Sequence, residues 1–214
     1  MLVLAGAGAA PFAVATDTFD INEGELHFLT EPPAEPPHRH TKRLHITADS
    51  LKTGWVQAEQ CHYQLDQVPA MEIVFGKDKV RKLKVVKAQN IAELWIEGPT
   101  VQMKNVRADA FVCIASENRI LARNIAGDYV LTTGPFMRRF LDGYFPMQVS
   151  LEVDYPDKLL QFDNVTPAEL KLHTVGGRGH LKLDTLFEGR LTIALRFTDK
   201  KGTPLAKLAA PPRH

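Results

Sequence analysis

Apolar and polar residues alternate along most of this chain, and the alternation predicts β-strands. Strand-like segments recur about every ten residues between residues 44 and 197, separated by Gly, Pro, Asn and Asp. A period of two is typical of a strand with one buried face. The clearest apolar parity belongs to the segment 147–155: Met147, Val149, Leu151, Val153 and Tyr155. The spacing predicts an all-β fold, either one antiparallel β-sandwich or two small β-domains.

Residues 135–142 depart from this pattern and predict one short helix. Pro135 suits a first helical position, and Gly143 suits the left-handed residue that ends a helix. The apolar residues of the segment recur at helical spacing: Phe136, Met137, Phe140 and Leu141. We expect this helix to close one end of the sandwich, with Phe140 buried against a sheet.

Turn residues predict how neighbouring strands pair. The Gly76–Asp78 segment is expected to close one hairpin, and Glu188-Gly189 a second one near the C-terminus. Gly98-Pro99 marks a further turn between two strand-like segments.

Composition divides the chain into five expected parts. Residues 1–15 carry no charge and end in Ala-Val-Ala, a pattern typical of a secretory signal peptide, although the usual basic lead segment is missing. Residues 16–43 hold a first strand and a proline-rich arm. Residues 44–125 and 126–199 are two β-rich halves or domains, and the tail 200–214 is expected to be disordered. The N-terminus predicts a periplasmic or secreted protein.

Charge and hydropathy exclude some classes of protein. The formal net charge of +1 argues against a general nucleic-acid-binding protein, which needs a basic surplus to pair with phosphates. No apolar segment reaches the ~20 residues that a transmembrane helix requires. We therefore expect neither a nucleic-acid partner nor a transmembrane span.

Cys61 and Cys113 are the two cysteines of the chain. In an exported protein an even count predicts a disulfide, which here closes a loop of about 50 residues. The alternative is a pair of buried free thiols that act as small apolar residues.

Histidines are the first candidates for a chemical role, and His38, His40 and His45 are the weak candidates for metal ligands. His38 and His40 share a face if the segment is extended, whereas His40 and His45 fall on opposite faces. Their spacing matches no known metal site, and the alternative is a set of solvated histidines. We expect no bound metal and no cofactor.

Catalytic signatures are weak throughout the chain. Ser116 lacks the flanking glycines of a nucleophile elbow, and scattered carboxylates such as Asp66 and Glu72 fit the solvent faces of strands. The chain is therefore expected not to be an enzyme, and a hydrolase stays an alternative.

Two groups of side chains are candidate binding surfaces. The first combines aromatic residues with arginines, a composition found at interfaces: Phe136, Arg138, Arg139, Phe140, Tyr144 and Phe145. Its alternative is a core that anchors the helix. The second is a basic cluster that predicts an anion-binding patch: Lys77, Lys79, Arg81, Lys82, Lys84 and Lys87. Its alternative is a charged edge strand that prevents aggregation.

Together these features predict an exported, non-catalytic binding or assembly factor of a bacterial cell envelope. Its partner is expected to be a protein or another envelope component, with lipid as a further option. The alternative function is a carrier of an apolar ligand in a cavity lined by residues such as Trp95, Phe111 and Leu151.

Overall fold

The computed structural model describes residues 22–141, 143–173 and 179–200, and these residues form an all-β fold with one four-residue helix, α1 (Ser50–Thr53). The predicted signal segment and all of the tail except Lys200 lie outside the described residues. The strands of the largest sheet are β1 (His27–Phe28), β2 (His38–His45), β3 (Trp55–Tyr63), β4 (Ala70–Val74), β5 (Val80–Glu97), β6 (Thr100–Arg119), β11 (Met147–Asp154), β13 (Leu172–His173) and β14 (His180–Glu188). A second sheet contains β7 (Leu121–Arg123), β8 (Tyr129–Phe136), β12 (Leu160–Thr166) and β15 (Leu191–Asp199), and a separate hairpin joins β9 (Arg138–Phe140) to β10 (Gly143–Phe145).

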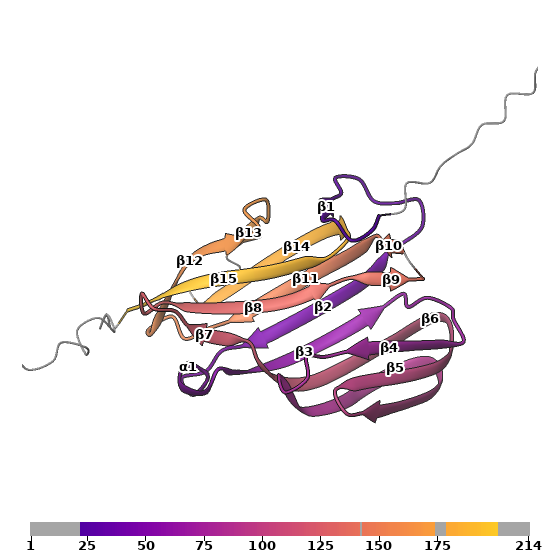
Figure 1. Ribbon diagram of the computed structural model, residues 1–214, viewed down its shortest axis with the longest axis horizontal. Helices are drawn as coiled ribbons and strands as arrows, with labels where there is room; N and C mark the ends of the chain where they lie inside the picture. Colours follow the sequence, from indigo (N-terminus) through magenta and orange to yellow (C-terminus); the bar gives the residue numbers. More distant parts are fainter. Residues whose placement is uncertain (1–21, 142, 174–178, 201–214) are drawn as a thin grey trace, which may run out of the picture.

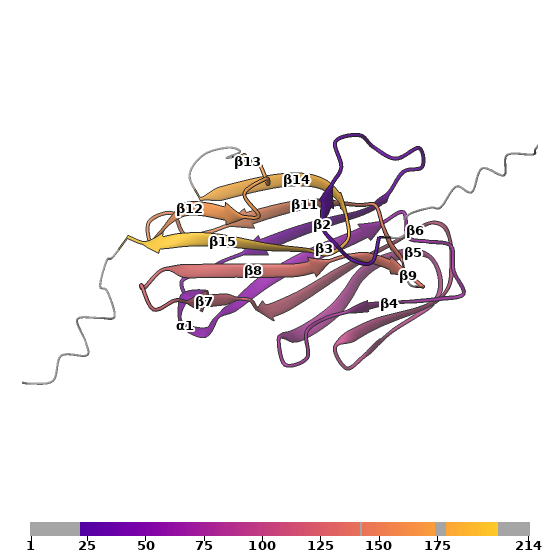
Figure 2. The same ribbon diagram turned by 45° about the horizontal axis from the view of Figure 1, so that its top comes forward.

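The two larger sheets face each other as a sandwich (Figures 1 and 2). The first has the order β1-β14-β11-β2-β3-β6-β4, with β5 and β13 paired to β6 and β14, and the second has the order β12-β15-β8-β7. β2 and β11 run parallel, whereas the other strand pairs of the described residues are antiparallel.

The main hydrophobic core fills the space between the two sheets. The alternation predicted for 147–155 is confirmed, because the apolar residues of β11 are buried and its polar residues are not. β15 contributes its own alternating set from the opposite sheet: Leu191, Ile193, Leu195 and Phe197. The sandwich therefore forms because the apolar faces of β11 and β15 face each other across one core layer.

A smaller second core lies inside the long hairpin of β5 and β6. These strands turn at Gly98-Pro99 as predicted, and the first residues of β6 pair with β5 on one side and β4 on the other. Register shifts in β5 and residues with left-handed backbone, such as Asn90 and Asn105, accompany the bend of this hairpin. The hairpin encloses the second core: Leu65, Val101, Met103, Val106, Ala110, Val112 and Ile114.

Two predicted hairpins are wrong. The Gly76–Asp78 turn forms, with the Lys79 N–H donating to the Gly76 carbonyl at 3.0 Å, but β4 and β5 both pair with β6 instead of with each other. Glu188-Gly189 joins β14 to β15, which belong to different sheets. Turn residues predict a change of direction, but the choice of partner depends on which apolar faces meet.

The predicted helix at 135–142 is also wrong. β8 continues to Phe136, which lies opposite Leu191 of β15, and Arg138 starts the β9–β10 hairpin after it. Pairing with β15 supplies backbone hydrogen bonds that a helix would have to give up, so tertiary pairing overrides the helical spacing. Phe136 is buried, but Phe140 is exposed, so the predicted burial of Phe140 does not occur.

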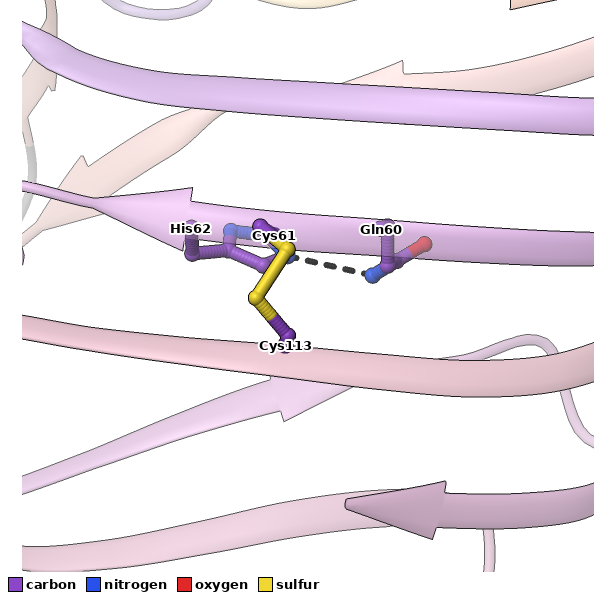
Figure 3. Close-up of a disulfide and its surroundings, with 4 residues drawn as sticks. All are labelled: Gln60, Cys61, His62 and Cys113. Atoms are coloured by element: carbon purple, nitrogen blue, oxygen red, sulfur yellow. Dashed lines mark hydrogen bonds between the residues drawn. A yellow bond between two sulfur atoms is a disulfide. The ribbon is translucent and has the colours of Figure 1, made fainter. Parts of the chain in front are cut away.

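The predicted disulfide between Cys61 and Cys113 is confirmed, with a sequence separation of 52. The two residues lie directly opposite each other on β3 and β6, as Figure 3 shows. The antiparallel register thus brings the cysteines together. The disulfide joins β3, which belongs to the sandwich, to β6, which supplies most of the second core.

Gly189 allows the crossing between the sheets. Its φ is +87°, and a Cβ there would lie 1.8 Å from the Glu25 carbonyl oxygen. Gly98 has a φ of +55°, but a Cβ added there would meet no atom within 4 Å, which makes Gly98→Ala a matched control. We expect Gly98→Ala to cost about 1 kcal/mol for its left-handed backbone, and Gly189→Ala about 1–3 kcal/mol more because backbone must move. Urea unfolding measures both, and equal losses would contradict the proposed clash.

Candidate functional site

A patch of polar side chains interrupts the buried face of the large sheet. It consists of five residues on β2 and β3, here called the buried polar patch: His38, His40, Lys42, Gln60 and His62. Two rows of paired residues cross it. One runs from Val149 through His40 and His62 to Val112, and the next from Leu151 through Lys42 and Gln60 to Ile114. Since each row begins in the main core and ends in the second, the patch lies between the two cores.

Hydrogen bonds order the patch around His62. The Gln60 amide Nε2 donates to His62 Nε2 at 3.1 Å, drawn as a dashed line in Figure 3. The neutral His62 ring then carries its proton on Nδ1, which lies 3.0 Å from His38 Nε2. His40 stacks on His62 with ring centroids 4.1 Å apart, and its buried Nε2 has no hydrogen-bond partner among the described residues. The imidazoles of His62 and His38 are thus held in the neutral form.

Burial is the main cause of the altered pKa values in the patch. It lowers the pKa of His38 to about 4, with Asp66 raising this pKa and Arg138 lowering it. Burial, the neighbouring histidines and Lys42 lower the pKa of His40 and His62 well below 6.5. Burial also lowers the pKa of Lys42 to about 8. The patch therefore disfavours positive charge.

The structure separates the three weak metal candidates. His38 and His40 share the inner face as predicted, but His45 is exposed on the outer face. No group of three or more His, Cys, Asp or Glu side chains in the described residues is arranged to hold a metal ion.

The β9–β10 hairpin lies at one end of the sandwich (Figures 1 and 2). Several apolar side chains of this segment are exposed to solvent. Leu141 is 79% exposed and Phe140 51%, which is high for large apolar residues. Together with their exposed neighbours they form what we call the hairpin surface: Met137, Arg139, Phe140, Leu141 and Phe145. Exposed apolar groups concentrated on one hairpin are typical of an interaction site.

Ion pairs and aromatic contacts fix the base of this hairpin. Arg138 donates to both carboxylate oxygens of Asp66, with its Nε 3.1 Å from Asp66 Oδ2. Tyr144 lies between two guanidinium groups, with its ring centroid 5.9 Å from Arg139 and 5.5 Å from Arg190. The Tyr144 N–H donates to the carbonyl of Asn22, close to where the described chain begins.

The first predicted binding surface divides into an exposed and a buried part. Arg139, Phe140 and Phe145 are exposed, and Arg138 and Tyr144 are half-buried. Phe136 is buried in the main core, and its ring lies 5.2 Å from that of His40, so it belongs to the support of the hairpin and not to its surface.

The predicted basic cluster lies on β5 and the turn before it, and part of it is neutralised. A bulge at residues 81–84, with left-handed backbone at Lys82, directs Arg81 and Lys82 to the Glu117 carboxylate at 2.7 Å each. These hydrogen bonds lower the pKa of Glu117. Lys87 lies 5.2 Å from the Phe111 ring, while Lys77, Lys79 and Lys84 are exposed.

A hollow of about 420 Å³ opens on the outer face of the large sheet beside this bulge. Its lining is mostly charged and polar: Arg43, His45, Gln57, Ala58, Glu59, Lys82, Ala115, Ser116, Glu117 and Asp154. Asp154 accepts from Arg43 at 2.9 Å and lies 2.7 Å from His180 Nδ1, and these hydrogen bonds lower its pKa despite partial burial. Asp154 and His180 thus form an acid–histidine pair here, but the pair is one of a series of cross-strand charge pairs. Among the described residues, no nucleophilic side chain contacts it.

The residues suggested for an apolar cavity do not come together. Leu151 is buried in the main core, Trp95 is partly exposed on β5, and Phe111 lies on the outer face beside Tyr63. In the described residues no helix is long and apolar enough to cross a membrane.

Sequence reasoning missed Lys42, Gln60 and His62 as members of one site. The available signal was parity: Leu44 is buried, so Lys42, His40 and His38 must share its face, and Ala58 assigns Gln60 and His62 to the same side. No known family model matches the sequence, and no curated protein matches it.

Proposed function

We propose that this chain is an exported, non-catalytic β-sandwich protein that binds the lipid surface of the cell envelope through its hairpin surface. The exposed apolar side chains of the hairpin surface, which lie beside Arg139, are the observation that carries the proposal. Arginine suits anionic headgroups, and Phe and Leu suit the region just beneath them.

The size of the hairpin surface favours a membrane over a protein partner. Stable protein interfaces use roughly 20–30 residues on each side, far more than one short hairpin offers. Transfer of its four apolar side chains out of water is worth about 4–5 kcal/mol, scaled from full burial. One arginine near an anionic surface adds about 1 kcal/mol. The sum resembles the marginal, reversible binding of a single myristoyl chain.

The disulfide supports the exported part of the proposal. Structural disulfides persist in oxidising compartments and are rare where thiols are kept reduced. The uncharged segment 1–15 with its Ala-Val-Ala ending adds the pattern of a cleaved signal. The periplasm and the cell exterior both satisfy these conditions.

Vesicle co-sedimentation tests the membrane proposal. The double variant Phe140→Ala/Leu141→Ala is expected to lose about tenfold or more in binding to mixed phosphatidylcholine–phosphatidylglycerol vesicles. Because both side chains are exposed, its free energy of unfolding should change by less than about 1 kcal/mol. Ile125→Ala is the matched control, since Ile125 is 96% exposed in the turn between β7 and β8.

Wild-type protein that fails to sediment with these vesicles would overturn the membrane proposal. Equal binding by the hairpin variant and the Ile125 variant would show that another surface makes the contact. Capture of the protein on a purified envelope protein, with no vesicle binding, would instead favour a protein partner.

A further inference from the structure

The buried polar patch lies under the base of the hairpin surface. Phe136, the last residue of β8, packs against His40, and its ring lies 5.6 Å from Lys42 Nζ. Two residues later Arg138 begins β9 and pairs with Asp66. The segment that leads into the hairpin therefore packs on the patch through Phe136 and is held beside it by the ion pair of Arg138.

This seat requires uncharged imidazoles. His62 accepts from Gln60 through Nε2, so a second proton on His62 would set two donors against each other unless the amide rotates. His40 is enclosed between the rings of His62 and Phe136, and its unpaired Nε2 is buried. A proton added to His40 Nε2 therefore creates a buried charge without a hydrogen-bond acceptor among the described residues, and a proton added to His62 Nε2 requires the Gln60 amide to rotate so that its unpaired Oε1 can accept.

Among the described residues, the charges that act on the patch offer no free counter-ion. Lys42 and Arg138 are cations, and both lower the pKa of neighbouring histidines. Asp66 is the carboxylate that acts on His38, and it is already paired with Arg138. The elements that pack on the patch from β8 and β6 present Phe136 and Val112, which carry no charge. A protonated His38 must therefore compete with Arg138 for Asp66.

We propose that the buried polar patch is an acid-sensitive latch: His38, His40 and His62 take up protons when Phe136 and the start of β9 lift away, and the lifted hairpin binds anionic membranes more strongly. Lifting exposes the apolar ring of Phe136, frees the Arg138 guanidinium from Asp66, and uncovers cationic imidazoles. All three changes favour an anionic lipid surface. The proposal rests on the membrane binding proposed above, and it adds how that binding is regulated.

The pH range of the latch follows from the difference between its two states. In the lifted state the imidazoles are solvated and titrate near the ordinary pKa of 6.5, whereas His38 in the closed state titrates at about 4. The lifted state therefore binds more protons between these values. The closed state is fully favoured above about pH 6.5, and each histidine weakens it about tenfold per pH unit as the pH falls.

Amide hydrogen exchange tests the latch directly. Protection of the amides in residues 136–141, corrected for intrinsic rates, is expected to fall at least about fifteenfold between about pH 6.5 and about pH 5.0, which is the effect of His38 alone. His40→Phe keeps an aromatic ring in the stack and removes one titrating group, so it should retain more protection than wild type at the lower pH. His45→Gln, exposed on the outer face, should behave as wild type.

Vesicle binding by the same variants distinguishes the latch from the membrane proposal. Wild type and His45→Gln are expected to bind mixed anionic vesicles about tenfold or more tightly at about pH 5.0 than at about pH 7.5, and His40→Phe to show a smaller rise. Acid-dependent exchange without vesicle binding at any pH would sustain the latch and defeat the membrane function. The latch would be overturned if neither vesicle binding nor amide exchange changed with pH, or if His40→Phe altered neither of them. Either result would leave the membrane function intact.

Discussion

Lowering the pH from about 7.5 to about 5.0 is expected to reduce the free energy of unfolding by about 2 kcal/mol through His38 alone, whose folded pKa is about 4, and further through His40 and His62. His38, His40 and His62 have folded pKa values below the unfolded value of 6.5, and burial is the main cause. The unfolded chain binds more protons in this range, so stability is complete above about pH 6.5 and is lost as the pH falls toward 4. A loss of this size is already a large fraction of the stability of a typical domain.

Urea unfolding at a series of pH values measures this loss. His40→Phe should be close to wild type near pH 7.5 and more stable than wild type near pH 5.0, because one proton-linked contribution is removed. The exposed His45→Gln variant serves as the control. Parallel stability curves for wild type and His40→Phe would show that His40 titrates normally in the folded protein.

Removal of the disulfide is expected to cost about 4 kcal/mol on the chain-entropy account. Cys61 and Cys113 close a loop with a sequence separation of 52, and their half-buried positions on the outer face allow replacement without a large cavity. The double variant Cys61→Ala/Cys113→Ala should therefore keep its fold and unfold at lower urea concentration. The β3–β6 ladder of paired residues stays in place to hold the two strands together.

A reducing agent supplies the control for the disulfide. Dithiothreitol should lower the urea midpoint of the wild type toward that of the double variant and leave the double variant unchanged. A double variant as stable as oxidised wild type would mean that strand pairing alone restrains these residues. Free thiols in protein taken from its native host would count against export.

Periodicity predicted the strands well because one face of each strand is buried. β11 and β15 carry uninterrupted apolar parities, and both were assigned correctly. The same reasoning failed at 135–141, where Phe140 and Leu141 are apolar but exposed. Apolar periodicity shows which face of a segment is buried only where the apolar residues serve the core. On the hairpin surface the apolar residues are exposed and do not serve the core.

Pairing partners and the buried patch were harder to obtain from sequence. β14 and β15 are adjacent in the chain but lie in separate sheets, since Phe187 and Phe197 both reach the main core from opposite layers. His62 and Gln60 resemble solvent-facing residues until the parity of their strand is fixed. The predicted disulfide contained that register information, because Cys61 opposite Cys113 places His62 opposite Val112.

The parallel contact between β2 and β11 also sets an order of events for the newly made chain. Met147 lies opposite His38, so about a hundred residues must be delivered before β2 can gain this neighbour, and such distant contacts form slowly. Until then one edge of β2 is open. The large sheet is thus completed only after most of the chain has been made, so the chain remains partly unfolded for most of its synthesis.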